Sequence, residues 1–146
     1  MKDAGYSLRD AVYNALNGLL TYTVDGISTS IDVYSYVAHD VDYPYVVIHP
    51  VLGDNPDYTK GTDDDIHEML LPIEVIFGFE QDAGDFEGCN EVMDQIIERL
   101  VKIILPMELY AMHAATQQNV QEFREQTDTH EIIRKYLTMK YIVERK

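Results

Sequence analysis

The sequence predicts an α+β domain in which a mixed, mainly antiparallel sheet of about five strands carries two helices on one face. Apolar side chains occupy every second position from Met69 to Phe79, which is the pattern of a half-buried strand. From Phe86 to Ile104 they recur instead at three- and four-residue steps, with acidic residues on the opposite side, as in an amphipathic helix. We expect the apolar sides of this strand and helix to pack on each other.

Length and composition indicate a single domain over residues 1–146. A chain of 146 residues with 46% hydrophobic residues can fill one core, so it is not a disordered chain. Cys89, the single cysteine, cannot form an internal disulfide and is interpreted as a core residue of a protein from a reducing compartment. The segment Met1–Gly5 lacks an apolar signal, and no run of residues is long enough to span a bilayer. We therefore expect a soluble protein made in a cytoplasm.

The N-terminal half is expected to hold a helix and two strands. Ser7 can cap a helix whose apolar stripe runs to Leu19, and the segment Thr21–Ser30 is predicted to be a loop or turn. The segment Ser30–Val37 alternates like a strand and places Tyr34 and Tyr36 on one face. The next segment, Tyr43–Leu52, is almost continuously apolar, which predicts a strand covered on both faces.

The C-terminal part is expected to end the second helix and close the sheet. Pro106 should stop the helix that begins at Asp85 and runs to Leu105. Residues 107–115 fit either one helical turn or the entry to a strand. Residues 116–146 are predicted to form a C-terminal β-hairpin. The expected order is therefore α-β-β-β-α-β-β, with both helices on one face.

A polar loop at residues 53–65 should project from the sheet as an acidic tip. Its carboxylates do not follow the ligand spacing of an EF-hand, so we predict a solvated tip and no metal site. Lys60 lies outside any glycine-rich turn that opens a helix, which argues against a phosphate cradle. The acidic residues of this loop are Asp54, Asp57, Asp63, Asp64 and Asp65.

No arrangement of residues favours catalysis, so we predict no catalytic residue and no cofactor. The five histidines, at positions 39, 49, 67, 113 and 130, are scattered, and no nucleophile elbow accompanies them. His49 is interpreted as a structural histidine because no second metal ligand lies at a suitable spacing. Glu74 with Asp63–Asp65 resembles a loose nuclease carboxylate cluster, but the lysine that such nucleases use is missing.

The charge balance opposes nucleic-acid binding. Eleven Lys and Arg residues against 26 Asp and Glu residues give a net charge of −15, which repels a phosphate backbone. The chain also contains eleven tyrosines. Exposed tyrosines on a sheet are typical of protein contacts, because they combine a large apolar area with a polar tip.

The order of elements resembles the tail-terminator, or tail-completion, proteins of long-tailed bacteriophages. The likeness lies in the opening helix with Leu8, Val12 and Leu16, the Tyr-Pro-Tyr-Val-Val-Ile run at 43–48, and the polar loop that follows. It continues through the strand at 70–79, the helix at 85–105 and the hairpin at 120–143. The resemblance implies a non-enzymatic virion protein that is assembled in the host bacterial cytoplasm. It also implies a ring, commonly of six subunits, that ends tail-tube growth and meets the head-side connector.

A ring of this kind gives the acidic and aromatic residues expected roles. A negative wall would let DNA pass through the channel without binding, and the loop Asp54–Asp65 would face the channel or the adjoining ring. Subunit or partner contacts would use the residues Tyr34, Tyr36, Tyr58, Lys60 and Tyr136. The alternatives are another neck protein for head completion or head-tail joining, a small acidic DNA-mimic inhibitor, and an enzyme. The mass in solution separates a monomeric inhibitor from a ring.

Overall fold

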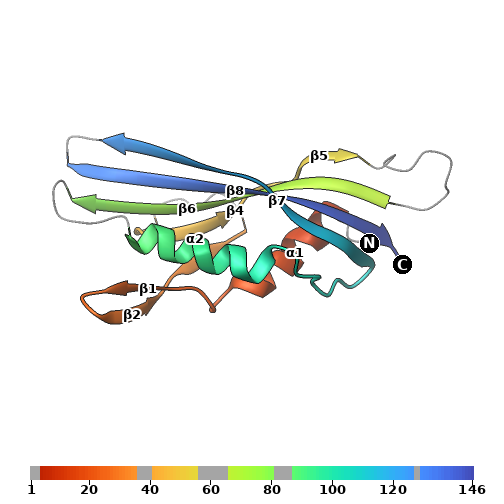
Figure 1. The fold of residues 1–146 in the computed structure, drawn as a ribbon, viewed down its shortest axis with the longest axis horizontal. Coiled ribbons are helices and arrows are strands. Elements are labelled where there is room, and N and C mark those ends of the chain that lie inside the picture. The colour runs from red at the N-terminus through yellow and green to blue at the C-terminus, as the bar shows by residue number, and fades with distance from the viewer. Residues whose placement is uncertain (1–3, 36–40, 56–65, 81–86, 127–128) are drawn as a thin grey trace.

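The structure is a computed structural model, which describes residues 4–35, 41–55, 66–80, 87–126 and 129–146 (Figure 1). Ten elements follow one another along the described residues. They are α1 (Ala4–Leu16), β1 (Thr21–Val24), β2 (Ile27–Ser30), β3 (Asp32–Tyr34), β4 (Tyr45–Ile48), β5 (Leu52–Asn55), β6 (Ile66–Glu80), α2 (Glu87–Leu100), β7 (Tyr110–Gln126) and β8 (His130–Arg145). In this described part, no helix is long and apolar enough to cross a membrane.

The main sheet has six strands and is mostly antiparallel. Its order is β3-β4-β6-β8-β7, and β5 also pairs with β6. Only the β3–β4 pair is parallel among the pairs that the described residues form. β4 and β5 lie along the same edge of β6, because β4 pairs with residues 73–76 and β5 pairs with residues 68–70. The predicted fold class is therefore confirmed, with one strand more than expected in the sheet.

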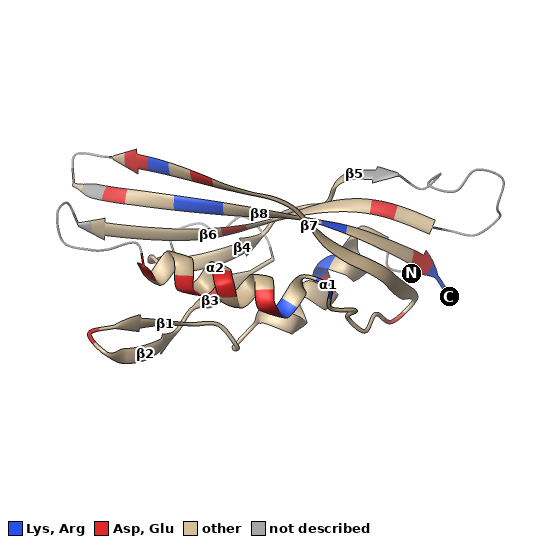
Figure 2. Cartoon of the chain, viewed as in Figure 1, with Lys and Arg blue, Asp and Glu red and all other residues tan. Residues whose placement is uncertain are grey.

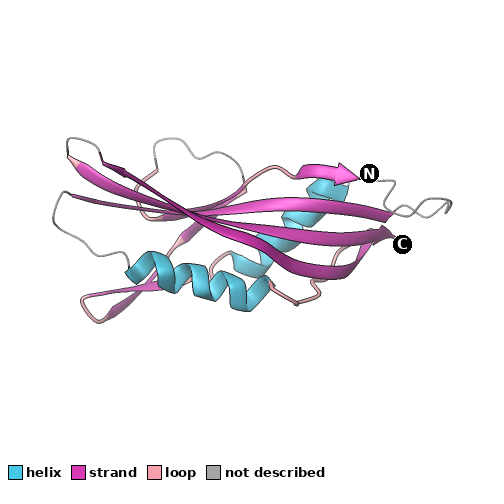
Figure 3. Ribbon diagram, turned by 45° about the horizontal axis from the view of Figure 1, so that its top comes forward, coloured by secondary structure: helices cyan, strands magenta, loops and turns pink. Residues whose placement is uncertain are grey.

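Both helices cover one face of the sheet, as Figure 3 shows. A single core joins the helices to the inward side chains of β6 and β8, because alternate residues of a strand point to the same face. From β6 this core takes Met69, Leu71, Ile73, Val75 and Phe77, which are the alternate residues that the sequence singled out. Burial of each such side chain stabilises the fold by about 1.5–3 kcal/mol. Cys89 lies fully buried in the same core.

The opposite face of the sheet, which we call the outer face, carries a second and smaller apolar cluster. Val47, Ile76 and Ile132 are buried there, and Tyr45 packs against them. Val46 and Ile48 of the same strand enter the main core. The segment Tyr43–Leu52 was predicted to be a strand covered on both faces. This is confirmed for the part of it that forms β4.

Three local predictions were wrong. The segment Thr21–Ser30 is a β-hairpin, β1–β2, whose turn places Asp25 at φ 49° and Gly26 at φ 78°. Such Asp-Gly turns match the twist of a two-residue hairpin, so the dipeptide was a signal for it. The second helix ends at Leu100 and not at Leu105, because the chain turns at Lys102 (φ 62°), where the backbone N–H donates to the Ala115 carbonyl at 2.8 Å. The expected strand at 30–37 is divided, since β2 ends at Ser30 and β3 covers only residues 32–34.

The C-terminal hairpin is longer than predicted. β7 begins at Tyr110, which resolves the open choice for residues 107–115 in favour of a strand. Its pairing with β8 runs from Tyr110–Arg145 to Gln126–Glu131. The register shifts between Met112 and Ala114 and again between Gln117 and Asn119, as at β-bulges.

Candidate protein-interaction surface on the outer face of the sheet

Two of the predicted contact residues lie in one row across the outer face. Tyr34 pairs with Val47, Val47 with Glu74, and Glu74 with Tyr136 in the register of four neighbouring strands. Residues that are directly opposite in a sheet point to the same face. Tyr34 and Tyr136, which are 102 positions apart in the sequence (136 minus 34), therefore share one surface. The two side chains between them in the row are buried.

Glu74 is the electrostatic centre of this surface. The residue is 3% exposed, and its carboxylate is held from both sides. Nε2 of His49 lies 2.8 Å from Oε1, and Nη1 of Arg134 donates to Oε2 at 2.9 Å. The Tyr136 hydroxyl also hydrogen-bonds this carboxylate. Because an ionised carboxylate only accepts hydrogen bonds, the His49 Nε2 must carry a proton.

These contacts keep Glu74 ionised despite its burial. Burial alone would raise the pKa of Glu74, but the hydrogen bonds from His49, Arg134 and Tyr136 outweigh it and hold the pKa below its ordinary value. The same contact acts in the opposite direction on Tyr136. Burial and the hydrogen bond to Glu74 raise the pKa of Tyr136 to about 12. A buried charge with three donors is costly to disturb, so the cluster fixes β6, β8 and the residue that follows β4 relative to one another.

Aromatic rings extend the surface on both sides of this cluster. On the β7 side, the rings of Phe123 and Tyr136 meet edge to face, with centroids 5.6 Å apart. On the β3 side, the Tyr45 ring contacts Tyr34 edge to face at 6.2 Å and Tyr43 in a stack at 5.8 Å. Phe123 is 50% exposed and Tyr43 is 39% exposed, so the apolar rings reach solvent at both ends.

An open depression of about 580 Å³ lies over the β7–β8 part of this face. Its lining combines aromatic, cationic and acidic side chains, namely Gln121, Phe123, Arg124, Glu125, Arg134 and Tyr136. Arg134 also reaches Glu125, with Nε 3.5 Å from the carboxylate. Exposed aromatic rings beside an arginine are the side chains enriched at the centres of protein interfaces. We name the outer-face residues Tyr34, Tyr43, Tyr45, Phe123, Arg134 and Tyr136 the aromatic surface.

Figure 2 shows a row of acidic residues along α2 and a basic band in β8, whereas β7 carries charges of both signs. The solvent side of α2 carries Glu87, Glu91, Asp94 and Glu98. On β8, Arg134 lies on the outer face, whereas its neighbour Lys135 faces α2, where its ammonium group contacts Asn90. The outer face thus offers the arginine Arg134 beside its aromatic rings, whereas the solvent side of α2 offers a row of carboxylates.

Many of the predicted site residues cannot be compared with the structure. Tyr36, Tyr58, Lys60, Asp57, Asp63, Asp64 and Asp65 lie outside the described residues. Asp54 belongs to β5, but its side chain is also outside the described part. Tyr34 and Tyr136 are described and lie on the same face.

The partners that complete this surface were not predicted from the sequence. Glu74 and His49 were noticed singly, and neither Arg134 nor Phe123 was selected. One usable signal was present, because a glutamate in an otherwise apolar strand needs a cationic partner if that strand is buried. Arg134, in a strand that alternates in the same way, could supply it.

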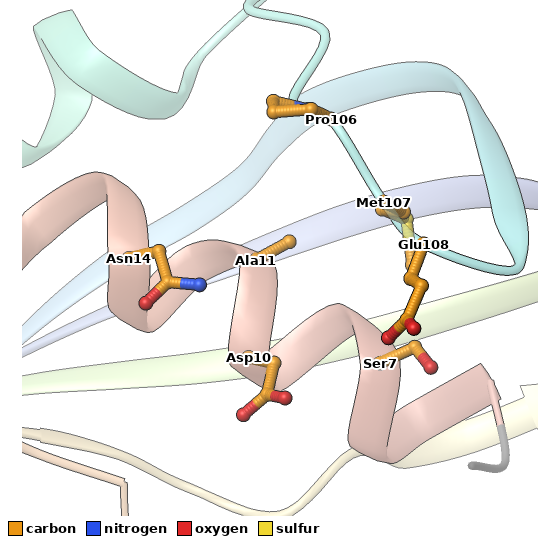
Figure 4. A pocket seen from close by; sticks show the side chains of 7 residues that line it. All are labelled: Ser7, Asp10, Ala11, Asn14, Pro106, Met107 and Glu108. Carbon is orange, nitrogen blue, oxygen red and sulfur yellow. The ribbon is translucent and has the colours of Figure 1, made fainter. Parts of the chain in front are cut away.

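Two other places in the fold offer less to a ligand. A pocket of about 140 Å³ lies between α1 and residues 106–108, where the Glu108 side chain points toward Ser7 (Figure 4). Among the described residues, the buried Ser7 hydroxyl has no hydrogen-bond partner. In the described ranges, no three His, Cys, Asp or Glu side chains are placed to hold a metal ion. Burial raises the pKa of the Cys89 thiol to about 11, which disfavours the reactive thiolate.

Comparison with known proteins relates this chain to a virus-like particle by its fold. No protein-family model matches the sequence. No curated protein matches it either. Among solved structures, the chain is similar to one from the "Virion of native gene transfer agent (GTA) particle", with 20% sequence identity and a TM-score of 0.65. The match covers 98% of this chain and 99% of the other. At this identity the likeness establishes a shared fold, and it extends over both chains almost completely.

Proposed function

We propose that this protein is a non-enzymatic structural component of a phage-like virion, located in its tail or neck. The observation that carries the proposal is the fold shared with a chain of a gene transfer agent particle over nearly the full length of both chains. The aromatic surface supports the proposal, because a virion protein must bind other virion proteins or further copies of itself through its exposed surface.

Within the virion, we assign the protein the role of tail terminator. Six copies form a ring on the head-proximal end of the tail tube, where the ring stops tube growth and meets the head-side connector. Tyr34 and Tyr136 contribute to the contacts between neighbouring copies, through head-to-tail packing that closes the ring. The loop Asp54–Asp65 faces the channel or the adjoining ring. The net charge of −15 then keeps passing DNA from binding to the wall.

Assembly of the purified protein tests the first part of this proposal. We expect Phe123→Ser to weaken self-association at least tenfold, because it removes an exposed ring of the aromatic surface. Ile104→Ser is the matched control, since Ile104 is 55% exposed but lies after α2 and outside this surface. Analytical ultracentrifugation at several concentrations gives the mass of each variant. A wild-type protein that stays monomeric at high concentration would favour the DNA-mimic inhibitor instead.

Tube growth tests the second part. Added to polymerising tail-tube protein encoded in the same genome, the wild-type ring should stop elongation and bind one end of each tube in electron micrographs. A ring that forms but leaves tube length unchanged would favour another neck protein, for head completion or head-tail joining. The Phe123→Ser variant should fail to stop elongation at concentrations at which Ile104→Ser still acts.

A further inference from the structure

The β1–β2 hairpin has one edge that is sealed by the helix beside it. Gln95 of α2 accepts from the Thr21 N–H at 3.0 Å and donates to the Thr21 carbonyl at 2.8 Å. Four residues earlier on α2, Glu91 accepts from the backbone N–H of Thr23 at 3.2 Å and from its hydroxyl at 3.0 Å. The two side chains thus take the place of a neighbouring strand along β1.

These hydrogen bonds between β1 and α2 show which backbone groups of β2 point away from the hairpin. Thr21 directs both its N–H and its carbonyl toward α2, so Thr21 and its cross-strand partner Ser30 form a pair without mutual hydrogen bonds. The Thr23–Ser28 pair follows the same pattern, because the Thr23 N–H also points to α2. The N–H and carbonyl groups of Ser28 and Ser30 therefore point away from the hairpin.

The edge of β2 carries none of the protections found at other edges. All four residues of β2 are exposed, and within the described residues β2 pairs only with β1. The segment contains no proline, lysine or bulge, which are the usual devices that block an edge strand. β7, the long edge strand of the main sheet, has two register shifts and carries charges at Glu122, Arg124 and Glu125.

The side chains around this edge define what could pair with it. Ile27 and Thr29 point to the same face of the hairpin as Tyr22 and Val24, because these residues are cross-strand partners. Tyr22 packs edge to face on Phe77, with ring centroids 5.4 Å apart. Farther out, Val24 is 47% exposed and Ile27 is 68% exposed, so this face ends in uncovered apolar side chains. A cavity of about 390 Å³ adjoins them, lined partly by Tyr22 and Val24.

The charges that flank the edge are both negative. Asp25 lies in the turn before β2, and Asp32 follows Ser30 by two positions. Both are exposed, and no lysine or arginine lies between them. The β2 edge of a second copy carries the same two aspartates, so pairing between two such edges would bring like charges together and is disfavoured.

We propose that the free edge of β2 binds an extended segment of a different protein by adding it as a third strand. The segment alternates apolar and polar side chains, so that its apolar side covers Val24 and Ile27. Lysine or arginine at its ends faces Asp25 and Asp32. Backbone hydrogen bonds to Ser28 and Ser30 supply affinity, and the alternate side chains supply specificity, as in other cases of strand addition.

Two peptides test the proposal on the isolated protein. The probe is acetyl-Lys-Val-Thr-Val-Thr-Lys-amide, and the matched peptide replaces both lysines by glutamate. We expect the basic probe to slow hydrogen exchange at the Ser28 and Ser30 amides, as observed by NMR, while the acidic peptide does not. Equal effects of both peptides, or no protection by either, would overturn the proposal.

Substitutions in the edge provide the second test. Ser28→Pro removes an outward N–H without affecting the β1–β2 pairing, because proline is tolerated where the N–H of an edge strand faces solvent. We expect it to weaken probe binding about tenfold, the effect of losing one hydrogen bond of about 1.4 kcal/mol. Ser28→Thr keeps the N–H and should bind as the wild type does. Unchanged exchange at the Tyr22 and Thr29 amides would show that the proline variant keeps its hairpin.

A charge variant keeps the test decisive if the proline variant loses its hairpin. Asp32→Lys lies outside β2 and should weaken binding of the basic probe while it improves binding of the acidic peptide. Retention of the wild-type preference by Asp32→Lys would contradict the proposed partner chemistry. These measurements do not depend on ring assembly, so they can fail or succeed independently of the tail-terminator role.

Discussion

The carboxylate of Glu74 and the guanidinium of Arg134, which belong to neighbouring strands, form an ion pair of 2.9 Å on the outer face of the sheet. The Glu74 side chain is 4% exposed and the Arg134 side chain is 27% exposed. One end of the pair is thus buried and the other is at the surface. His49 completes the pair from the opposite side, with Nε2 at 2.8 Å. The contact therefore links β6, β8 and His49, the residue after β4, beside the exposed aromatic rings.

Removal of Arg134 should destabilise the fold, because the buried Glu74 carboxylate then loses its arginine partner. We expect Arg134→Met to lower the free energy of unfolding by about 3 kcal/mol, the usual effect of breaking a buried pair from one side. Arg124→Met is the control, because Arg124 pairs with Glu122 at 3.2 Å but its side chain is 61% exposed. The control should lose less than about 1 kcal/mol. Urea denaturation measures both, and similar losses would contradict the buried-pair interpretation.

Glu74 should also make stability depend on pH on the acid side. Its pKa is lower in the folded protein than its ordinary value of 4.5. The folded state therefore favours the ionised form, so the contribution is present above pH 4.5 and is lost as the pH falls through the folded pKa. We expect the difference in melting temperature between wild type and Glu74→Gln to shrink as the pH falls from about 6 to about 3. A constant difference would show that the ionised form is not favoured by folding.

The parts of the fold that were predictable are those whose burial has a local period. β6 and α2 each present one apolar side to the core, and the repeat of two or of three to four residues reports this directly. The β1–β2 hairpin was missed because none of the four residues of β2 is buried, so no apolar alternation marks it. Its support comes from Glu91 and Gln95, about 70 positions away in the sequence.

The aromatic surface was predictable only in part for a similar reason. The tyrosine count suggested a contact surface, and Tyr34 and Tyr136 were selected for it. The pairing that unites them depends on the register of four strands, and Glu74 is 60 positions from Arg134. Local patterns do not contain such a register, so the ion pair and the row across the sheet could be recognised only in the structure.

Gln95 should control the local stability of the hairpin more than the stability of the whole domain. Gln95→Leu removes both hydrogen bonds to the Thr21 backbone and leaves those groups to water. Because a two-stranded hairpin alone is marginally stable, we expect the Tyr22 and Thr29 amides to exchange about tenfold faster. Glu98→Leu, an exposed position on the same helix, should leave their exchange unchanged. Faster exchange throughout the main sheet in Gln95→Leu would point to global destabilisation instead.

The close contact between Gly78 and Tyr43 should make a methyl group at position 78 destabilising. A Cβ at Gly78 would lie 2.5 Å from Cδ2 and 2.8 Å from Cγ of the Tyr43 ring. Non-bonded carbon atoms in proteins essentially never approach so closely. The ring must then move, but it also stacks on Tyr45. We expect Gly78→Ala to lower the free energy of unfolding by about 1–3 kcal/mol, as overpacking does.

A double-mutant cycle identifies the contact that causes this loss. In a Tyr43→Ser background the ring is absent, so Gly78→Ala should cost less than about 0.5 kcal/mol, and the coupling energy should exceed about 1 kcal/mol. Gly88→Ala extends the test to a second site, because a Cβ there would lie 2.8 Å from Cε2 of Phe77. Its cost should be the same with or without Tyr43, since the two glycines meet different rings. If Gly78→Ala is equally harmful in both backgrounds, the strain arises from the β6 backbone and not from the Tyr43 ring.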